Sequence, residues 1–145
     1  IQMSMADAAV ILHFKQLLLR GIEILKHCSN GVARRRVLWL DRSLTRLYID
    51  REKRISSTGV EKGINIDDIS EVRPGINSAA LAGVTFSPTL TAKCLTIVGS
   101  ERSISLQLPS QEARDMMVMR LHLFVGHQKK QNEENARLAA QTRSP

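Results

Sequence analysis

Apolar positions recur along this chain with two spacings, one typical of helices and one typical of strands. Residues 5–19 carry apolar side chains at helical spacing, which predicts an amphipathic helix. Short apolar runs separated by turn residues follow between residues 22 and 108, and they predict strands. Helical spacing returns after residue 110. Strands followed by a final helix indicate an α+β fold or a small barrel, and an apolar C-terminal helix can close one end of such a barrel.

The strand region begins with a predicted hairpin over residues 22–40, whose turn is Ser29-Asn30-Gly31. Beyond it, residues 51–63 and 76–92 are predicted loops, the second with room for one short helix. The other expected strands are 46–50, 64–72 (interrupted by Asp67-Asp68 and ended by Pro74-Gly75), 94–98 and 104–108, the last two joined by a turn at Gly99-Ser100.

The C-terminal third begins with Ser110, which is a suitable N-cap for a helix that stays apolar to about His127. Residues 128–145 are polar and have no core-forming stripe. We therefore divide the chain into an N-terminal amphipathic helix (1–18), a folded domain (19–127) and a polar tail, helical or disordered (128–145). The N-terminal helix either packs on the domain or lies on a membrane, and its low charge favours packing.

Positive charge is concentrated in one part of the chain. Residues 20–55 hold ten Lys or Arg and four acids, which is +6 of the net charge of +7. Lys26, Arg34, Arg35 and Arg36 lie around the turn of the first predicted hairpin. Strand alternation predicts Arg34 and Arg36 on one face and Arg35 on the other. Such a local cluster indicates an anionic partner, for example a phosphate group.

Several function classes find no support in the sequence. Cys28 and Cys94 lie far apart without CxxC spacing and the four histidines are scattered, so we predict no metal site. Because no nucleophile–base arrangement, glycine-rich phosphate loop or HExxH motif stands out, we expect neither catalysis nor a cofactor. Only five residues are aromatic, which disfavours base stacking and hence nucleic acid. No apolar run approaches the about 20 residues of a transmembrane helix.

Two stretches resemble the pleckstrin homology (PH) domain, particularly PH domains of the phospholipase C-delta type. One is the basic hairpin from Arg20-Gly21 to Leu40, and the other is IDDISEVRPG at 66–75, which is similar to the IxDIxEVRxG segment of that family. The chain also looks similar to the acylated PH-domain proteins of apicomplexan parasites. The resemblance covers residues 18–127. It implies an α+β fold: a PH-like, partly open antiparallel β-barrel of about seven strands, capped by the C-terminal helix, with an extra N-terminal helix.

The resemblance also implies where a ligand binds, because this family binds inositol phosphates at the open end of the barrel, beside the first two strands. Lys26 and Arg36 match the family's basic headgroup contacts, and Arg54 falls near a third. Arg34 belongs to the same basic run, whereas Arg35 adds general attraction. We therefore expect Lys26, Arg34, Arg35, Arg36 and Arg54 to form the headgroup site.

This sequence departs from the family pattern at three places. Cys28 stands where the family has a second lysine, Val32-Ala33 replaces an aromatic–basic pair at the turn, and Met116 or Met117 replaces a tryptophan of the final helix. The first two changes remove contacts to a multiply phosphorylated ring. Val32 is the residue we expect to touch the membrane.

These observations lead to one functional hypothesis and one alternative. The hypothesis is a membrane-targeting module, not an enzyme, that recognises the phosphate headgroup of an anionic phospholipid. We favour phosphatidic acid over polyphosphoinositides because one phosphomonoester needs fewer cations. We expect a cytoplasmic monomer, peripheral on the cytosolic face of a membrane such as that of a secretory organelle. The alternative is a protein-interaction PH domain without a specific lipid, with a partner bound through the N-terminal or C-terminal helix.

Overall fold

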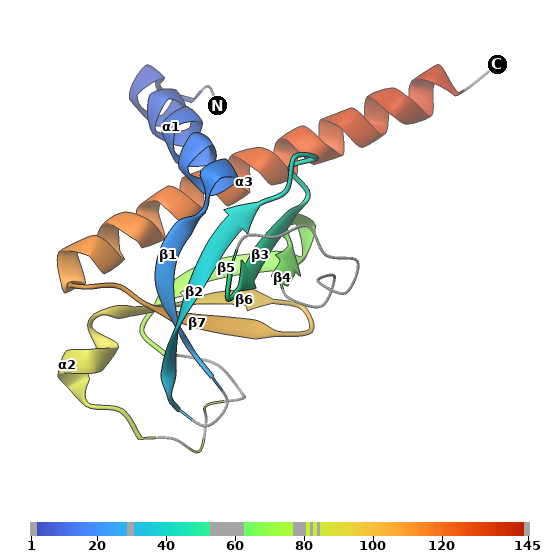
Figure 1. Cartoon of the computed structure of the whole chain (residues 1–145). Helices are drawn as coiled ribbons and strands as arrows, with labels where there is room; N and C mark the ends of the chain where they lie inside the picture. The colour runs from blue at the N-terminus through green and yellow to red at the C-terminus, as the bar shows by residue number, and fades with distance from the viewer. Residues whose placement is uncertain are drawn as a thin grey trace.

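The computed structural model describes residues 3–28, 31–52, 63–76, 81, 83 and 85–143. Within this described part, seven strands form one antiparallel sheet in the order β4-β3-β2-β1-β7-β6-β5 (Figure 1). The strands are β1 (Ile22–His27), β2 (Ala33–Leu40), β3 (Arg46–Asp50), β4 (Gly63–Asn65), β5 (Ile69–Pro74), β6 (Cys94–Gly99) and β7 (Ser103–Gln107). The helices are α1 (Met5–Arg20), the 3₁₀ helix η2 (Ile66–Asp68), α2 (Pro88–Thr91) and α3 (Gln111–Thr142).

The sheet curls into a partly open barrel whose two edge strands, β4 and β5, are joined directly through η2. β4 comes close to β6 where Ile64 lies over Gly99. A Cβ added at Gly99 would lie 2.3 Å from Cδ1 of Ile64 and 2.8 Å from the backbone oxygen of Arg102, and the backbone contact is the one that favours glycine. Together with the two long helices, this arrangement confirms the predicted α+β, PH-like barrel.

The prediction of one interrupted strand over residues 64–72 was wrong. The chain forms two strands there, and η2 turns the corner between them, so that β4 pairs with β3 while β5 pairs with β6. Ile64, Ile66 and Ile69 are all buried, and such a run of apolar positions is also what a single strand would show. The corner is held by the Ile66 amide, which donates to the Thr45 carbonyl at 2.9 Å.

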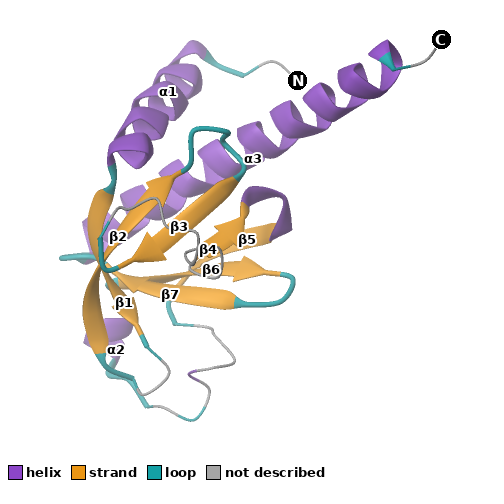
Figure 2. Cartoon of the chain, turned by 45° about the vertical axis from the view of Figure 1, so that its right-hand side comes forward, coloured by secondary structure: helices purple, strands orange, loops and turns teal. Residues whose placement is uncertain are grey.

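The core lies between the inner face of the sheet and the two long helices (Figure 2). On α1, Ile11, Phe14 and Leu18 are buried, so this helix packs on the domain. The rings of Phe14 and Phe124 of α3 meet edge to face with centroids 6.1 Å apart. The sheet contributes alternate residues, among them Ile24, Leu38, Leu40, Leu47, Ile49, Leu95, Ile97, Ile104 and Leu106.

Helix α3 begins at the predicted N-cap, where the Ser110 hydroxyl accepts a hydrogen bond from the Ala113 amide at 3.1 Å. It continues past its last buried apolar residue, Val125, as far as Thr142. Lys129 fastens this polar part to the barrel, because its Nζ donates to the Ile69 carbonyl at 2.9 Å. Within the described residues, none of the helices is long and apolar enough to cross a membrane.

The turn between β2 and β3 is organised by Asp41. Its Oδ1 accepts from the Thr45 and Arg46 amides at 2.9 and 3.1 Å, and its Oδ2 accepts from the Ser43 and Thr45 hydroxyls at 2.7 and 2.9 Å. Burial by itself would raise the pKa of the Asp41 carboxyl, but these hydrogen bonds outweigh it and lower the pKa below 3.8. They also hold Leu44 at a φ of 61°.

Replacing Asp41 by alanine should destabilise the fold by about 1–3 kcal/mol at pH 7, because several turn donors lose a charged acceptor. Since the folded-state pKa is lowered, the carboxylate stabilises the fold above pH 3.8, and this stabilisation is lost as the pH falls through the folded-state value. Urea unfolding at pH 7 and near pH 3 measures the difference. Asp68→Ala, which removes an exposed carboxylate, is the control. A deficit of the same size at both pH values would contradict this role of the charge.

Candidate functional site

The β1–β2 hairpin carries the basic cluster, and its pairing register decides where each side chain points. Lys26 pairs with Arg34, Leu25 with Arg35, and Ile24 with Arg36. Directly paired residues lie on the same face of a sheet, and faces alternate along each strand. Because Ile24 and Leu38 belong to the core, Lys26, Arg34 and Arg36 continue the core-facing side at the hairpin end. Arg35 lies on the opposite face.

These three cations differ in exposure. Arg34 is exposed, whereas Lys26 and Arg36 are half-buried. The Arg36 guanidinium donates from Nη1 to the Arg35 carbonyl at 2.7 Å. The cluster therefore covers the end of the barrel that the hairpin forms.

Acidic residues of the same strands lie on the other face. In β1, β2 and β3, which the structure describes completely, the acids are Glu23 and Asp50, paired with Val37 from either side. Val37 lies on the opposite face from Arg36 and Leu38, and Glu23 and Asp50 share the face of Val37. Both carboxylates therefore project away from the three cations. On the core-facing side of these three strands, every charged position is positive.

The turn of the hairpin is short. The Cys28 amide donates to the Val32 carbonyl at 3.0 Å, and the Gly31 amide donates to the Cys28 carbonyl at 2.8 Å. Gly31 has a φ of 83°, which favours glycine. Val32, the predicted membrane contact, is 47% exposed at this tip. Arg54, the fifth predicted cation, lies outside the described residues.

A buried polar junction on the opposite face of the hairpin was not foreseen from the sequence. His27 directs Nε2 to Oε1 of Gln107 at 3.0 Å and to Sγ of Cys94 at 3.7 Å. The Phe86 ring packs edge to face against the imidazole, with centroids 5.4 Å apart. These residues come from four separate segments, and no local pattern links them. The junction fixes the hairpin to β6, β7 and the segment before α2.

Cys94 is inert in this environment. Burial raises the pKa of its thiol to about 11, although the positive charge of Arg114 acts in the other direction. The sulfur donates to the Leu90 carbonyl at 3.2 Å. Both cysteines are free thiols. Within the described residues, no group of three or more metal-ligating side chains occurs.

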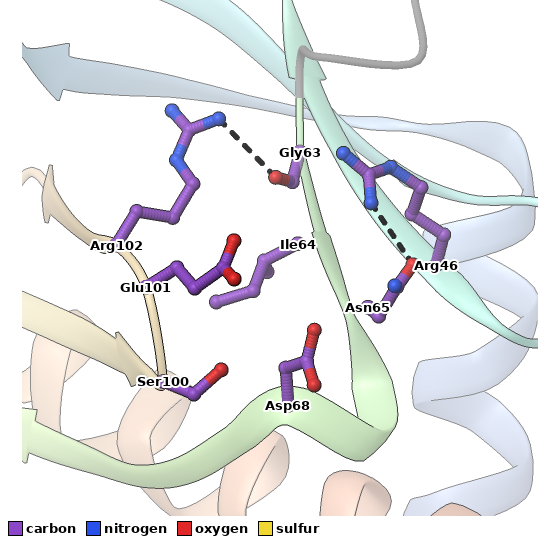
Figure 3. Close-up of a pocket in the computed structure, with 8 residues that line it drawn as sticks. All are labelled: Arg46, Gly63, Ile64, Asn65, Asp68, Ser100, Glu101 and Arg102. Atoms are coloured by element: carbon purple, nitrogen blue, oxygen red, sulfur yellow. Dashed lines mark hydrogen bonds between the residues drawn. The ribbon is translucent and has the colours of Figure 1, made fainter.

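A cavity of about 300 Å³ lies between the β4 edge and the β6–β7 turn (Figure 3). Two arginines and two carboxylates line it, Arg46, Arg102, Asp68 and Glu101. Arg46 donates from Nη1 to Oδ1 of Asn65 at 2.9 Å, and Arg102 donates from Nη1 to the Gly63 carbonyl at 3.3 Å. Of the predicted headgroup residues that the structure describes, none lines this cavity, and among its described lining residues the two arginines are matched by two carboxylates.

Comparisons with known proteins find similarity in three dimensions only. No family model matches the chain, and no curated protein matches it in sequence. Among solved structures, Inner Membrane Complex Sub-compartment Protein 1 from Toxoplasma gondii is similar, with a TM-score of 0.56 and 19% identity over 87% of this chain and 96% of that chain. The PH domain from TgAPH has a TM-score of 0.54 and 10% identity over 85% and 94% of the two chains.

L. pealei PLC21 is similar over 76% of this chain and 16% of its own length, with a TM-score of 0.52 and 17% identity. At sequence identities this low, the similarity shows a shared fold and nothing finer. The chain therefore has the fold of a pleckstrin homology domain, and the resemblance inferred from the hairpin and from residues 66–75 is confirmed at that level.

The buried junction predicts how the two thiols react. At pH 8 the half-buried Cys28 should react with a thiol reagent in the native protein, whereas Cys94 should react only on unfolding, because it is buried and stays protonated. Counting reacted thiols before and after adding denaturant measures this. In the Cys28→Ser variant the fast phase should disappear. Two fast equivalents in the native wild type would contradict the buried position of Cys94.

Proposed function

We propose that this chain is a membrane-targeting module that binds the phosphate headgroup of an anionic phospholipid at the hairpin end of the barrel. The observation that carries the proposal is the register of β1 and β2, which places Lys26, Arg34 and Arg36 on one face without an acid from β1–β3. Such a site is non-catalytic, because it supplies charge and hydrogen-bond donors and no nucleophile or base.

The chemistry of these side chains suits a phosphomonoester. An arginine guanidinium donates two parallel hydrogen bonds to phosphate oxygens, and a lysine supplies a compact charge. Like charges that face each other across two strands repel, and the register sets Lys26 opposite Arg34. A phosphate dianion between the strands reverses this repulsion. Two arginines and one lysine then neutralise and orient a single phosphate group.

Phosphatidic acid fits this number of cations better than a polyphosphoinositide. Its headgroup is one phosphomonoester close to the bilayer surface, whereas an inositol polyphosphate presents several phosphates in different directions. Cys28 stands where PH domains of the phospholipase C-delta type have a further lysine, which removes one contact for a second phosphate. Arg35, on the other face, adds general attraction to an anionic surface, at about 1 kcal/mol for a charge near it, and Arg54 stays a predicted headgroup contact.

In this proposal the domain stays at the membrane surface while its hairpin binds the lipid headgroup. Val32 at the tip enters the interfacial region, where one valine contributes at most about 1.5–3 kcal/mol when fully buried. The chain then acts as a peripheral protein on the cytosolic face of a membrane, with secretory organelles as the candidate compartment.

A second candidate function is protein interaction through a helix. The observation that favours it is the exposure of two methionines on α3, Met116 at 49% and Met119 at 47%, because flexible methionines are common at protein-binding surfaces. This function requires no lipid, so lipid binding separates the two candidates.

The lipid proposal predicts a difference between neighbouring arginines. Arg34→Ala and Arg36→Ala should each weaken binding to phosphatidic acid vesicles at least about tenfold, because charge-assisted hydrogen bonds to the phosphate are lost. Lys26→Ala should have a similar effect. Arg35→Ala removes the same charge from the opposite face, so it should cost no more than about fivefold. Co-sedimentation at physiological salt measures all four variants.

The vesicles would contain phosphatidylcholine alone or with phosphatidic acid, phosphatidylserine or a polyphosphoinositide, matched for total charge. Preference for phosphatidic acid that disappears in the Arg34 and Arg36 variants supports the proposal. Equal binding to every anionic vesicle means a nonspecific basic patch. Absence of binding to all of them overturns the lipid site and favours the protein-interaction function.

A further inference from the structure

Helix α3 carries apolar side chains on the face that is turned away from the barrel. Its buried residues, among them Met117 and Leu121, face the core. On the opposite face, Met116 and Met119 are 49% and 47% exposed, and Leu123 is half-buried. Spacings of three and four residues place these three side chains in one row along the helix. Exposed large apolar side chains that lie together mark an interaction surface.

Gly126 continues this row. It follows Leu123 by three residues and is exposed, in the interior of a helix that runs on to Thr142. Glycine at such a position weakens a helix relative to alanine, because the backbone loses more freedom on folding. Beyond the backbone of its own helix, a Cβ added at Gly126 would meet no described atom within 4 Å. The small size of this residue therefore serves the close approach of another molecule.

The row has the spacing of a helix–helix seam and is complementary to itself. Positions 116, 119, 123 and 126 alternate steps of three and four residues, as the apolar positions of a coiled coil do. Two copies of α3 can pack antiparallel about a twofold axis at the level of residue 121. Met116 of each copy then lies beside Gly126 of the other, and Met119 lies beside Leu123. A long side chain thus meets the position that leaves room for it, twice in the pair.

The charges at the two ends of the row agree with the same arrangement. Glu112 lies one turn before the row and Lys130 one turn after it, and both are exposed. Antiparallel packing in this register places Glu112 of each copy beside Lys130 of the other. A parallel pair would instead set Glu112 against Glu112 and Lys130 against Lys130, and like charges repel. Charge complementarity therefore favours the antiparallel second copy.

The other elements of the domain leave this face open. The main neighbours of α3 in the described structure are α1, η2, β5 and β6, and α3 lies along the outside of the barrel (Figure 2). Its contact with α1 lies on its buried side, where Phe14 meets Phe124. A second α3 can therefore lie along the outer face without displacing any of these elements.

We propose that α3 docks antiparallel on the α3 of a second copy of this chain, through Met116, Met119, Leu123 and Gly126, and forms a twofold-symmetric dimer. The inference rests on the second candidate function, for which it names the partner, and not on the lipid proposal, since no hairpin residue takes part. One helix face buries less area than a standard stable interface, so the dimer is weak, with a micromolar dissociation constant. It differs from the monomer expected from the sequence.

The first test is the mass in solution. Sedimentation equilibrium over a range of micromolar concentrations should show a monomer of 16.2 kDa in equilibrium with its dimer. Met119→Lys should weaken the dimer at least about tenfold, because the interface would bury an ammonium group. The matched control is Met5→Lys, which makes the same change at a methionine of α1 that is 90% exposed, and it should leave the dissociation constant unchanged.

The second test examines the antiparallel register. Glu112→Lys and Lys130→Glu should each weaken the dimer about fivefold, because each sets like charges together at both ends of the pair. The double variant Glu112→Lys/Lys130→Glu exchanges the two charges and should restore the wild-type dissociation constant. Circular dichroism should show the same helix content in all three, since both positions are exposed.

Gly126→Gln separates the interface from the stability of the helix. It should weaken the dimer, because the longer side chain fills the position that Met116 of the second copy needs. In dilute, monomeric protein it should raise the melting temperature, because glutamine favours a helix more than glycine does. A glycine needed for the fold of the single chain would give a lower melting temperature instead.

The outcomes decide between this inference and the other proposals. A single-chain mass at every concentration overturns the dimer and leaves this face of α3 to a different protein. A dimer that Met119→Lys weakens no more than Met5→Lys uses another surface, which also overturns the inference. If the single charge variants weaken the dimer and the double variant does not restore it, the antiparallel register is overturned. None of these results affects the lipid site, which the vesicle binding of Arg34→Ala and Arg36→Ala tests separately.

Discussion

The pairing register of β1 and β2 is the constraint on which both the core and the candidate site depend. Ile24 and Leu38 must face the interior, so every second residue toward the turn lies on the same face, and there the sequence places Lys26, Arg34 and Arg36. A slip by one residue would move the apolar set to the solvent side and would bring Arg35 to the barrel end in place of its neighbours. The short turn and the buried apolar residues exclude that slip, and thus stability and the position of the cations are selected by the same register.

The two long helices cover only one part of the barrel. α3 covers the β5 side through residues such as Leu121 and Phe124, and α1 packs on α3 and on β2 through Phe14. The hairpin end stays clear of both helices. Rigidity at this end comes instead from the His27–Gln107–Cys94 junction, which joins three strands behind the cations. A binding site placed on strands that are fixed from behind holds its geometry better than one placed on a loop.

Much of the fold could be predicted from the sequence, because its elements follow local patterns: apolar periodicity, the Ser110 cap and the turn at 29–31. The split between β4 and β5 could not, because Ile64, Ile66 and Ile69 are buried whether the chain continues straight or turns a corner. Alternation was enough to separate Arg35 from Arg34 and Arg36. It gives no information on contacts between distant segments, such as those of His27 with Phe86 and Cys94, since these depend on which strands pair across the sheet.

The distribution of acids, more than that of arginines, distinguishes the hairpin end from the cavity beside β4. The cavity near the β6–β7 turn contains Arg46 and Arg102, but Asp68 and Glu101 line the same space and oppose any anion that enters. At the hairpin end the strand carboxylates, Glu23 and Asp50, lie on the far side of the sheet. Within a few ångströms, an equal number of acids cancels the attraction that two or three cations exert on an anion. Acids on the other side of a sheet lie farther from the anion, so they cancel less of this attraction. Among the described strand residues, acids therefore oppose an anion less at the hairpin end than in this cavity.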